Sequence, residues 1–362
     1  MTLLDCCPNA SERVARLRRL YERRATDEVF AFMKTPLRAM EDFARRHPGG
    51  PCAYPAPEER ARFWRRLLAE QARVDDDRVP AAYLTELDQG LYGGLVGAPV
   101  HFMANPDWGW ISSMVHPILR EWDELDALHF DPDGTWARRY REILRVHVAA
   151  ASGRYGLSHF ILIDSLNFAF ELVGATRTYL ALDENPRRVR QAVDFAFDLN
   201  TWVQDRFFEA APLFAGGTCS NTAGWLPGRV VSESVDPFHM TSAETFRRWG
   251  VEPVERILAR YDGGITHIHG NGRHLLDAVC RLRGLRAVAF ADDKGAARAF
   301  DERHELRRRT GDMPLILSAP WSDFVAALRA RSLAGGCLYV VSDVPDADSA
   351  HRVMEEVRHY RC

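Results

Sequence analysis

The chain has 362 residues, of which 46% are hydrophobic, and its 47 Lys and Arg against 50 Asp and Glu leave a formal net charge of −3. This composition indicates a globular protein with a sizeable core and excludes an intrinsically disordered chain. Because no long block of one charge sign is present, we expect no nucleic-acid partner. No apolar run approaches the roughly 18 residues of a spanning helix, so we expect no membrane partner.

The cysteines and the first residues of the sequence indicate the cellular compartment. Seven cysteines are scattered without a CxxC pair, and the start, MTLLDCCPNASERV, has no basic segment followed by an apolar one. We therefore expect neither a secretory signal nor a disulfide framework. The sequence predicts a cytoplasmic protein.

The first 75 residues have a helical pattern. Apolar residues recur every three or four positions over 12–24, 27–46 and 57–74, and PGGPCAYPAP at 48–57 is typical of a loop. The arginines of the first segment alternate with Leu and Val, as on the solvated face of an amphipathic helix. We predict an N-terminal helical extension over 1–75, packed on a second unit over 76–362.

From residue 79 onward, short β-rich runs alternate with helical runs. Strands are predicted at 79–86, 157–164, 212–218, 265–270, 286–291, 314–318 and 337–342. An eighth strand at 100–104 stays open, because Asn105-Pro106 and the DWGW sequence after it are equally typical of a loop hairpin. Helices are predicted at 186–208, 242–261, 274–281, 294–309, 322–331 and 346–360. This order favours the α/β class, with a parallel sheet closed into a (β/α)8 barrel of the TIM type.

In such a barrel the catalytic groups lie at the carboxyl ends of the strands. His267 and His269 are two residues apart near the end of one predicted strand, so both side chains face the same way, just before Gly270-Asn271-Gly272. Two imidazoles make half of a catalytic zinc site, which usually has three protein ligands and one open position. The alternative is a pair of histidines that hydrogen-bonds a substrate without a metal.

The third metal ligand has two candidates. Cys219 follows the strand predicted at 212–218 and Asp343 follows the one at 337–342, so both are expected at the catalytic end. Cys337 begins its strand. At about 3.3 Å per residue it lies too far from Ser342 to share the site, and we expect it in the core.

Further polar residues are expected at the same end. Asp164 ends its predicted strand, and Asp236 and His239 lie in the polar segment VVSESVDPFHM before a helix. These three residues are the candidates for acid–base catalysis. An alternative for Asp236 is that it only braces a turn before the cap of the next helix.

Substrate contacts are predicted from Trp110, Asn271 and Asp292. Trp110 belongs to a group with Trp108 and Trp225 that either lines a pocket or fills local core. Asn271 and Asp292 each follow a predicted strand.

The segment FHMTSAETFRRWGVEPVERILARYDGGITHIHGNG, supported by LVGATRTYLALDENPRRVRQAV and GWLPGR, resembles the uroporphyrinogen decarboxylase superfamily, over roughly residues 79–360. That superfamily includes zinc-dependent methyltransferases, which move methyl groups between corrinoid proteins and thiols. The resemblance implies a barrel fold, a zinc cofactor, a small-molecule substrate and a corrinoid protein as methyl donor and partner.

Two departures from the family pattern bear on chemistry. The Arg-Gln-Ala-Gly-Arg motif with which uroporphyrinogen decarboxylases hold substrate carboxylates is missing from the N-terminal segment, so uroporphyrinogen is not the expected substrate. The zinc methyltransferases have His-x-Cys and a distant Cys, whereas this chain has His269 in the first Cys place and Ser342 or Asp343 in the second. A zinc ion without thiolate ligands is a harder Lewis acid.

Three hypotheses follow. In the first, zinc on His267, His269 and either Asp343 or Cys219 binds a thiol or other nucleophile for methyl transfer. In the second, the chain is a metal-free lyase in which the histidines and an Asp donate a proton during decarboxylation of a small aromatic or pyrrolic acid. In the third, it is a binding module for a tetrapyrrole or corrinoid partner.

Overall fold

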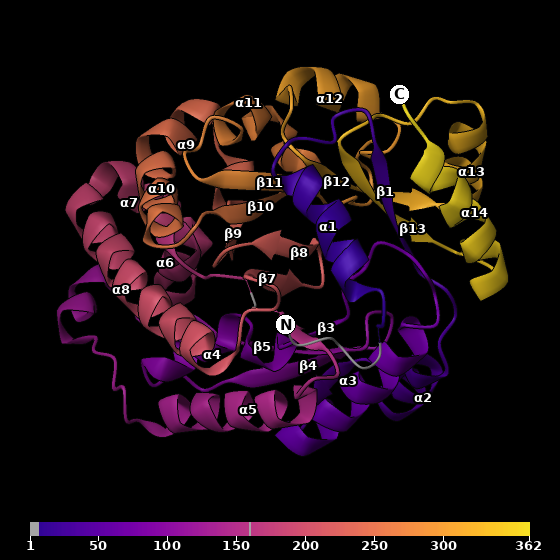
Figure 1. Cartoon of the computed structure of the whole chain (residues 1–362). Helices are drawn as coiled ribbons and strands as arrows, with labels where there is room; N and C mark the ends of the chain where they lie inside the picture. The colour runs from indigo at the N-terminus through magenta and orange to yellow at the C-terminus, as the bar shows by residue number, and fades with distance from the viewer. Residues whose placement is uncertain (1–6, 159–160) are drawn as a thin grey trace.

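The computed structural model describes residues 7–158 and 161–362. Its largest sheet has six strands, all paired in parallel. In sheet order these are β1 (Val29–Met33), β13 (Cys337–Ser342), β12 (Leu315–Pro320), β11 (Leu285–Phe290), β10 (Gly264–Ile268) and β9 (Val231–Ser234). In Figure 1 the strands lie at the centre, most helices surround them, and α1 crosses the centre.

Two smaller sheets complete the strands. One joins β3 (Ala81–Tyr83), β6 (Gly156–Ser158) and β7 (Gly217–Ser220) in parallel, and β7 forms an antiparallel hairpin with β8 (Gly224–Pro227). The other is antiparallel and consists of β2 (Gly50–Cys52), β4 (His101–Asn105) and β5 (Trp110–Met114).

Two contacts connect the first small sheet to the large one. Ile161, after β6, forms a parallel bridge with Ser232 of β9. The backbone N–H of Asp77, before β3, donates to the carbonyl of Ala31 in β1 at 3.2 Å. Within residues 7–158 and 161–362 no ladder joins β1 to β3, so the structure shows a mixed α/β fold with a parallel sheet that is not closed.

The helices follow the strands along the chain. They are α1 (Ala10–Tyr21), α2 (Arg38–Arg46), α3 (Pro57–Gln71), α4 (Gln89–Leu95), α5 (Thr135–Ala151), α6 (Ser165–Val173), α7 (Ala175–Glu184), α8 (Pro186–Ala210), α9 (Ala243–Trp249), α10 (Val251–Arg260), α11 (Leu276–Val279), α12 (Arg303–Thr310), α13 (Trp321–Arg329) and α14 (Ala347–His359). Among these described helices, none combines the length and apolar character that crossing a bilayer requires.

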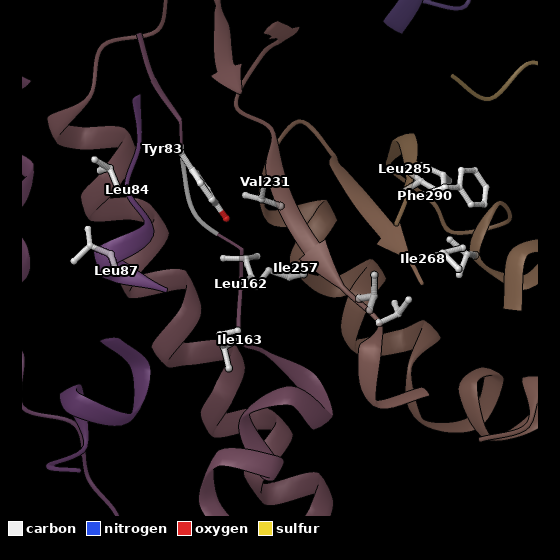
Figure 2. Close-up of a cluster of buried hydrophobic side chains, with 14 of the residues drawn as sticks. Tyr83, Leu84, Leu87, Leu162, Ile163, Val231, Ile257, Ile268, Leu285 and Phe290 are labelled. Carbon is white, nitrogen blue, oxygen red and sulfur yellow. The ribbon is translucent and has the colours of Figure 1, made fainter. Parts of the chain in front are cut away.

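The sheet is packed on both faces. Residues that alternate along the strands, such as Phe30, Phe32, Ile265 and Leu338, form an inner cluster that α1 and the β7–β8 hairpin cover. The other set packs outward against the helices. Figure 2 shows part of this outer cluster, with Leu162, Ile163, Val231, Ile257 and Ile268 among its labelled side chains. Since successive side chains of a strand alternate in direction, His267 faces inward like Ile265.

The helical prediction for 27–46 is wrong over its first part, which is strand β1. The sequence VFAFM is buried at all five positions. A strand of a parallel sheet that is covered on both faces has no polar side, so it lacks the alternation that identifies an exposed strand. The segment predicted as a separate helical extension thus supplies a strand to the large sheet.

The strand prediction for 212–218 is also wrong. The strand there begins at Gly217 and turns back as a hairpin, and the strand of the large sheet is β9, within a segment that was expected to be a polar loop. The segment 100–104, left open between strand and loop hairpin, is strand β4 of the small antiparallel sheet. The helix predicted at 242–261 is divided at Gly250 into α9 and α10, and the one predicted at 294–309 begins only at Arg303.

Cys337 lies where the sequence predicts it, at the start of β13 and fully buried in the outer cluster. Cys337→Ser is expected to cost about 1 kcal/mol of unfolding free energy, because it places a hydroxyl among apolar side chains. Metal content should not change. Denaturant unfolding and elemental analysis of the same sample check both points, and a loss of metal would contradict the placement of this residue.

Candidate metal centre

Asp236, His267 and His269 form a group whose ligand atoms all lie within 4.8 Å of one another. His267 pairs with Ser234 across β10 and β9, which are neighbours in the sheet. Asp236, two residues beyond Ser234, begins the short 3-10 helix η3 (Asp236–Met240) and thereby reaches the end of β10. Asp236 Oδ1 is 3.0 Å from Nε2 of His267 and 3.9 Å from Nε2 of His269.

The residues of this group fit a metal ion. Asp236 Oδ1 is buried, and within residues 7–158 and 161–362 no donor has hydrogen-bond geometry to it. Nε2 of His267 contacts this oxygen at 3.0 Å, and a metal ion between the carboxylate and the two imidazole nitrogens would stabilise the buried charge. Two imidazoles and one carboxylate are ligands of catalytic zinc and also of non-haem iron.

The charges around Asp236 keep its carboxylate ionised, which is the form that binds a cation. Burial raises the pKa of Asp236, but the hydrogen bond and charge of His267, with the charges of His239 and His269, outweigh burial and lower this pKa to about 2. Burial alone would lower the pKa of His267, yet Asp236 raises it above its ordinary value. Without a metal, therefore, Asp236 and His267 each favour the charged form of the other.

Metal binding is expected to weaken as the pH falls through the pKa of His267. A proton on its imidazole competes with the metal, whereas Asp236 stays ionised because its pKa is about 2. Below the raised pKa of His267 the affinity should fall about tenfold per pH unit, and above that pKa it should level off. Competition titrations with a chromophoric chelator at several pH values measure this, and a flat profile below that pKa would contradict it.

Asp293, which follows β11, orients His269. Its carboxylate lies 2.9 Å from Nδ1 of His269 and accepts the backbone N–H of Gly270 at 2.7 Å. A carboxylate on the far nitrogen of a ligating histidine fixes the ring and its tautomer. Nε2 of His269 is thereby left for the metal.

Asp293→Ala is expected to lower metal affinity about 10- to 100-fold, as loss of such an outer partner typically does. Asp292→Ala is the matched control. Asp292 accepts the backbone N–H of Ala299 at 2.8 Å and lies 3.5 Å from the guanidinium of Arg273, so it braces a loop. Equal losses from the two variants would show that Asp293 acts through loop structure instead.

His239 lies beside the metal group, with its ring centre 5.5 Å from that of His269 and Nδ1 3.6 Å from Asp236 Oδ1. Burial, above all, lowers its pKa to about 4, so the ring is neutral near pH 7. Its Nε2 is buried without a hydrogen-bond partner among the residues that the structure describes. Gly272 makes room for it, since a Cβ there would lie 2.2 Å from the His239 ring.

Asp164 lies apart from the metal group, buried beside Glu233 of β9. Burial, above all, raises the pKa of Asp164 to about 6 and that of Glu233 well above its ordinary value, and the charge of Asp164 raises the pKa of Glu233 further. The Glu233 backbone in turn accepts a hydrogen bond from His267.

The two residues predicted as third ligand do not reach the histidines. Cys219 lies in β7, buried in the inner cluster, where burial raises the pKa of its thiol to about 12. Asp343 is exposed after β13, and its carboxylate accepts from the hydroxyl of Ser342. Since β13 and β10 are three strand spacings apart, Asp343 is about 14 Å along the sheet from the site. Asp236, predicted as an acid–base residue, occupies the third position.

Two of the three predicted substrate contacts line hollows of the structure, and these two hollows are different. Trp110 lines an inner cavity of about 540 Å³ together with Trp108 and Ala289. Asn271 lines an opening of about 630 Å³ that also contacts Asp236 and His269. Asp292 lines neither of them.

Sequence reasoning missed Asp88. It follows β3 and the short 3-10 helix η1 (Thr85–Leu87). Burial raises its pKa to about 6, although the charge of His267 acts to lower this pKa. Its position just after the strand predicted at 79–86 was the signal that could have identified it.

Comparisons with known proteins address the fold. No family model and no curated protein matches the chain. Among solved structures, a methyltransferase from Methanosarcina mazei aligns with a TM-score of 0.60 at 13% sequence identity, over 96% of this chain and 98% of that one. At this identity the likeness concerns the fold alone, so the chain shares the overall fold of that methyltransferase.

Proposed function

We propose that the chain is a methyltransferase-like enzyme in which Asp236, His267 and His269 hold a zinc ion. The observation that supports this most directly is the clustering of the buried Oδ1 of Asp236 with two imidazole nitrogens, at 3.0 and 3.9 Å, at neighbouring strand ends. When bound by three protein ligands, zinc keeps an open position at which it lowers the pKa of a thiol or other nucleophile. His239, neutral near pH 7 and with Nδ1 3.6 Å from Asp236 Oδ1, is our candidate to accept that nucleophile's proton.

We also propose that the strands complete a (β/α)8 barrel. Its eight strands would be β1, β3, β6 and β9 to β13, and the Ile161–Ser232 bridge and the Asp77–Ala31 hydrogen bond would connect the two sheets. The metal group then lies at the carboxyl end of the strands, where barrel enzymes have their active sites. This barrel begins with β1, inside the first 75 residues, and not at residue 76.

The methyl donor and acceptor are proposed from the family resemblance. A corrinoid protein would deliver the methyl group, and a small nucleophile would receive it. Because the ligand set has no thiolate, the centre is harder than that of the thiol methyltransferases and also accommodates an oxygen or nitrogen nucleophile.

Metal content and turnover test this function together. The purified protein is expected to contain about one zinc per chain and to transfer methyl from methylcobalamin to a small nucleophile, followed by the absorbance of the cobalamin. Exhaustive chelation should abolish turnover, and zinc should restore it. Full activity after chelation, or failure to bind any transition metal, would overturn the proposal.

A metal-free carboxy-lyase is the second candidate. The buried carboxyl pair of Asp164 and Glu233, whose pKa values burial raises, favours it, because the Glu233 backbone contacts His267. A decarboxylation needs a proton donor of this kind at the carbon that loses carbon dioxide. Release of carbon dioxide from a small aromatic acid by chelated protein, with loss on Asp164→Asn, would select this reading.

A further inference from the structure

The chain has only two lysines, Lys34 and Lys294, against 45 arginines. Both follow parallel strands, Lys34 directly after β1 and Lys294 shortly after β11, and both line hollows at that end of the sheet. Arg and Lys are not equivalent, because the ammonium is a compact point charge whereas the guanidinium is a planar fork. Arg occupies almost every cationic position of this chain. We therefore expect the two lysines at sites that favour a compact charge.

Lys34 lines the inner cavity of about 540 Å³, which is within the usual size of small-molecule sites. The wall of this cavity is mostly apolar and aromatic. It includes Phe32, Trp108, Trp110, Ala289, Ile316 and Val340. Ala289 is the register partner of His267, so the cavity adjoins the strand that carries two of the metal ligands.

The polar groups of the cavity include two cations close to each other. Lys34 lines the cavity, with Nζ 4.6 Å from the Trp108 ring centre, and it forms no ion pair within residues 7–158 and 161–362. Arg78 lies 5.2 Å over the ring of Phe32 and 3.5 Å from the carboxylate of Asp76. Burial and the charge of Arg78 together lower the pKa of Lys34 to about 8.

Two carboxylates also line this cavity, but they do not neutralise Lys34. Glu41 and Asp107 are both exposed, and neither is within ion-pair distance of an ammonium or guanidinium group among the described residues. Lys34 is thus a cation beside a second cation, over an aromatic wall, without a carboxylate of its own. An anion is the group that would stabilise this arrangement.

We propose that this cavity binds an aromatic acid as the substrate of the metal centre, with its anionic group held by Lys34 and Arg78 and its ring between Trp108, Trp110 and the inner wall. The role as substrate rests on the proposed function. The binding itself does not, because it needs no metal.

Two naphthalene dyes that differ only in charge test this binding. The probe 8-anilinonaphthalene-1-sulfonate carries an anionic group, and N-phenyl-1-naphthylamine has the same rings without it. Both fluoresce when they enter an apolar cavity, so chelated and zinc-loaded protein can each be titrated. The anionic dye is expected to bind at least tenfold more tightly than the neutral one.

Variants of the two lysines locate the site. Lys34→Gln should weaken the anionic dye about 10- to 100-fold, the loss expected for one charge-assisted contact, and leave the neutral dye within about twofold of wild type. Lys34→Arg keeps the charge but replaces the compact ammonium by a planar fork, so its affinity for the anionic dye should lie between those of wild type and Lys34→Gln. Lys294→Gln is the matched control at the other opening and should change neither dye. Circular dichroism confirms that each variant is folded.

The inference would be overturned if the two dyes bound equally, or if Lys34→Gln and Lys294→Gln weakened the anionic dye to the same degree. Equal binding would show that no cation of the cavity selects the anionic group, and equal losses would show a general attraction by surface charge. Failure of the proposed function has a different signature, because a chain that binds no metal but distinguishes the dyes through Lys34 would keep the cavity site and lose only the zinc chemistry.

Discussion

Asp236→Ala should empty the metal site and leave the protein folded. The variant removes the one anionic ligand of the group and leaves two imidazoles, so affinity should fall by more than the roughly 10- to 100-fold that loss of an outer partner causes. The fold should tolerate it, since the Asp236 side chain is 43% exposed and fills little core. Competition with a chromophoric chelator measures the affinity, and thermal unfolding of the chelated protein checks the fold.

Asp343→Ala and Cys219→Ser are the controls for this prediction. Both residues were expected as ligands from the sequence, and in the structure neither lies in the metal group. Both variants should keep the metal, although Cys219→Ser should lower stability by about 1 kcal/mol, because it places a hydroxyl in the inner cluster. A metal site emptied by Asp343→Ala but not by Asp236→Ala would mean that the arrangement of β9 and β10 is wrong.

The contrast between these residues shows what the sequence can predict about the site. The spacing of His267 and His269 places both on one face of a strand end, which depends on local geometry alone. The third ligand depends on which strand lies beside β10, and that is a property of the whole sheet. Asp236 was placed at the correct end of the fold, but its neighbour was unknown because β9 had been assigned to a loop.

The reason for missing β9 is chemical. Its sequence, VSES, is polar at three of four positions, yet Glu233 and Ser234 are buried. Buried polar residues in a strand break the apolar pattern from which strands are predicted. Such disagreement between local sequence and structure is expected at functional sites. Strands β10 to β13 have ordinary apolar sequences and were predicted close to their observed bounds.

The largest effect on stability is expected from Glu86→Ala. Glu86 and Arg60 form an ion pair in which both side chains are only 3% exposed. The Arg60 guanidinium also donates to the carbonyl of Gly109 at 3.0 Å and lies 4.7 Å over the ring of Phe63. Removing the carboxylate leaves a buried, unpaired cation, which should cost about 3–5 kcal/mol of unfolding free energy. Urea unfolding at neutral pH measures this change.

A double variant separates the ion pair from the packing around it. Arg60→Met with Glu86→Leu replaces both charges by apolar groups of similar volume and should cost much less than Glu86→Ala alone, because no charge is left buried without a partner. Gly109 lies between Trp108 and Trp110, so the same ion pair positions the aromatic wall of the inner cavity. Glu86→Ala should therefore also weaken binding of both naphthalene dyes at temperatures where it remains folded. A stability loss below about 1 kcal/mol, or unchanged dye binding, would show that the turn between the antiparallel strands β4 and β5, which contains Gly109, is held by the pairing of these strands instead.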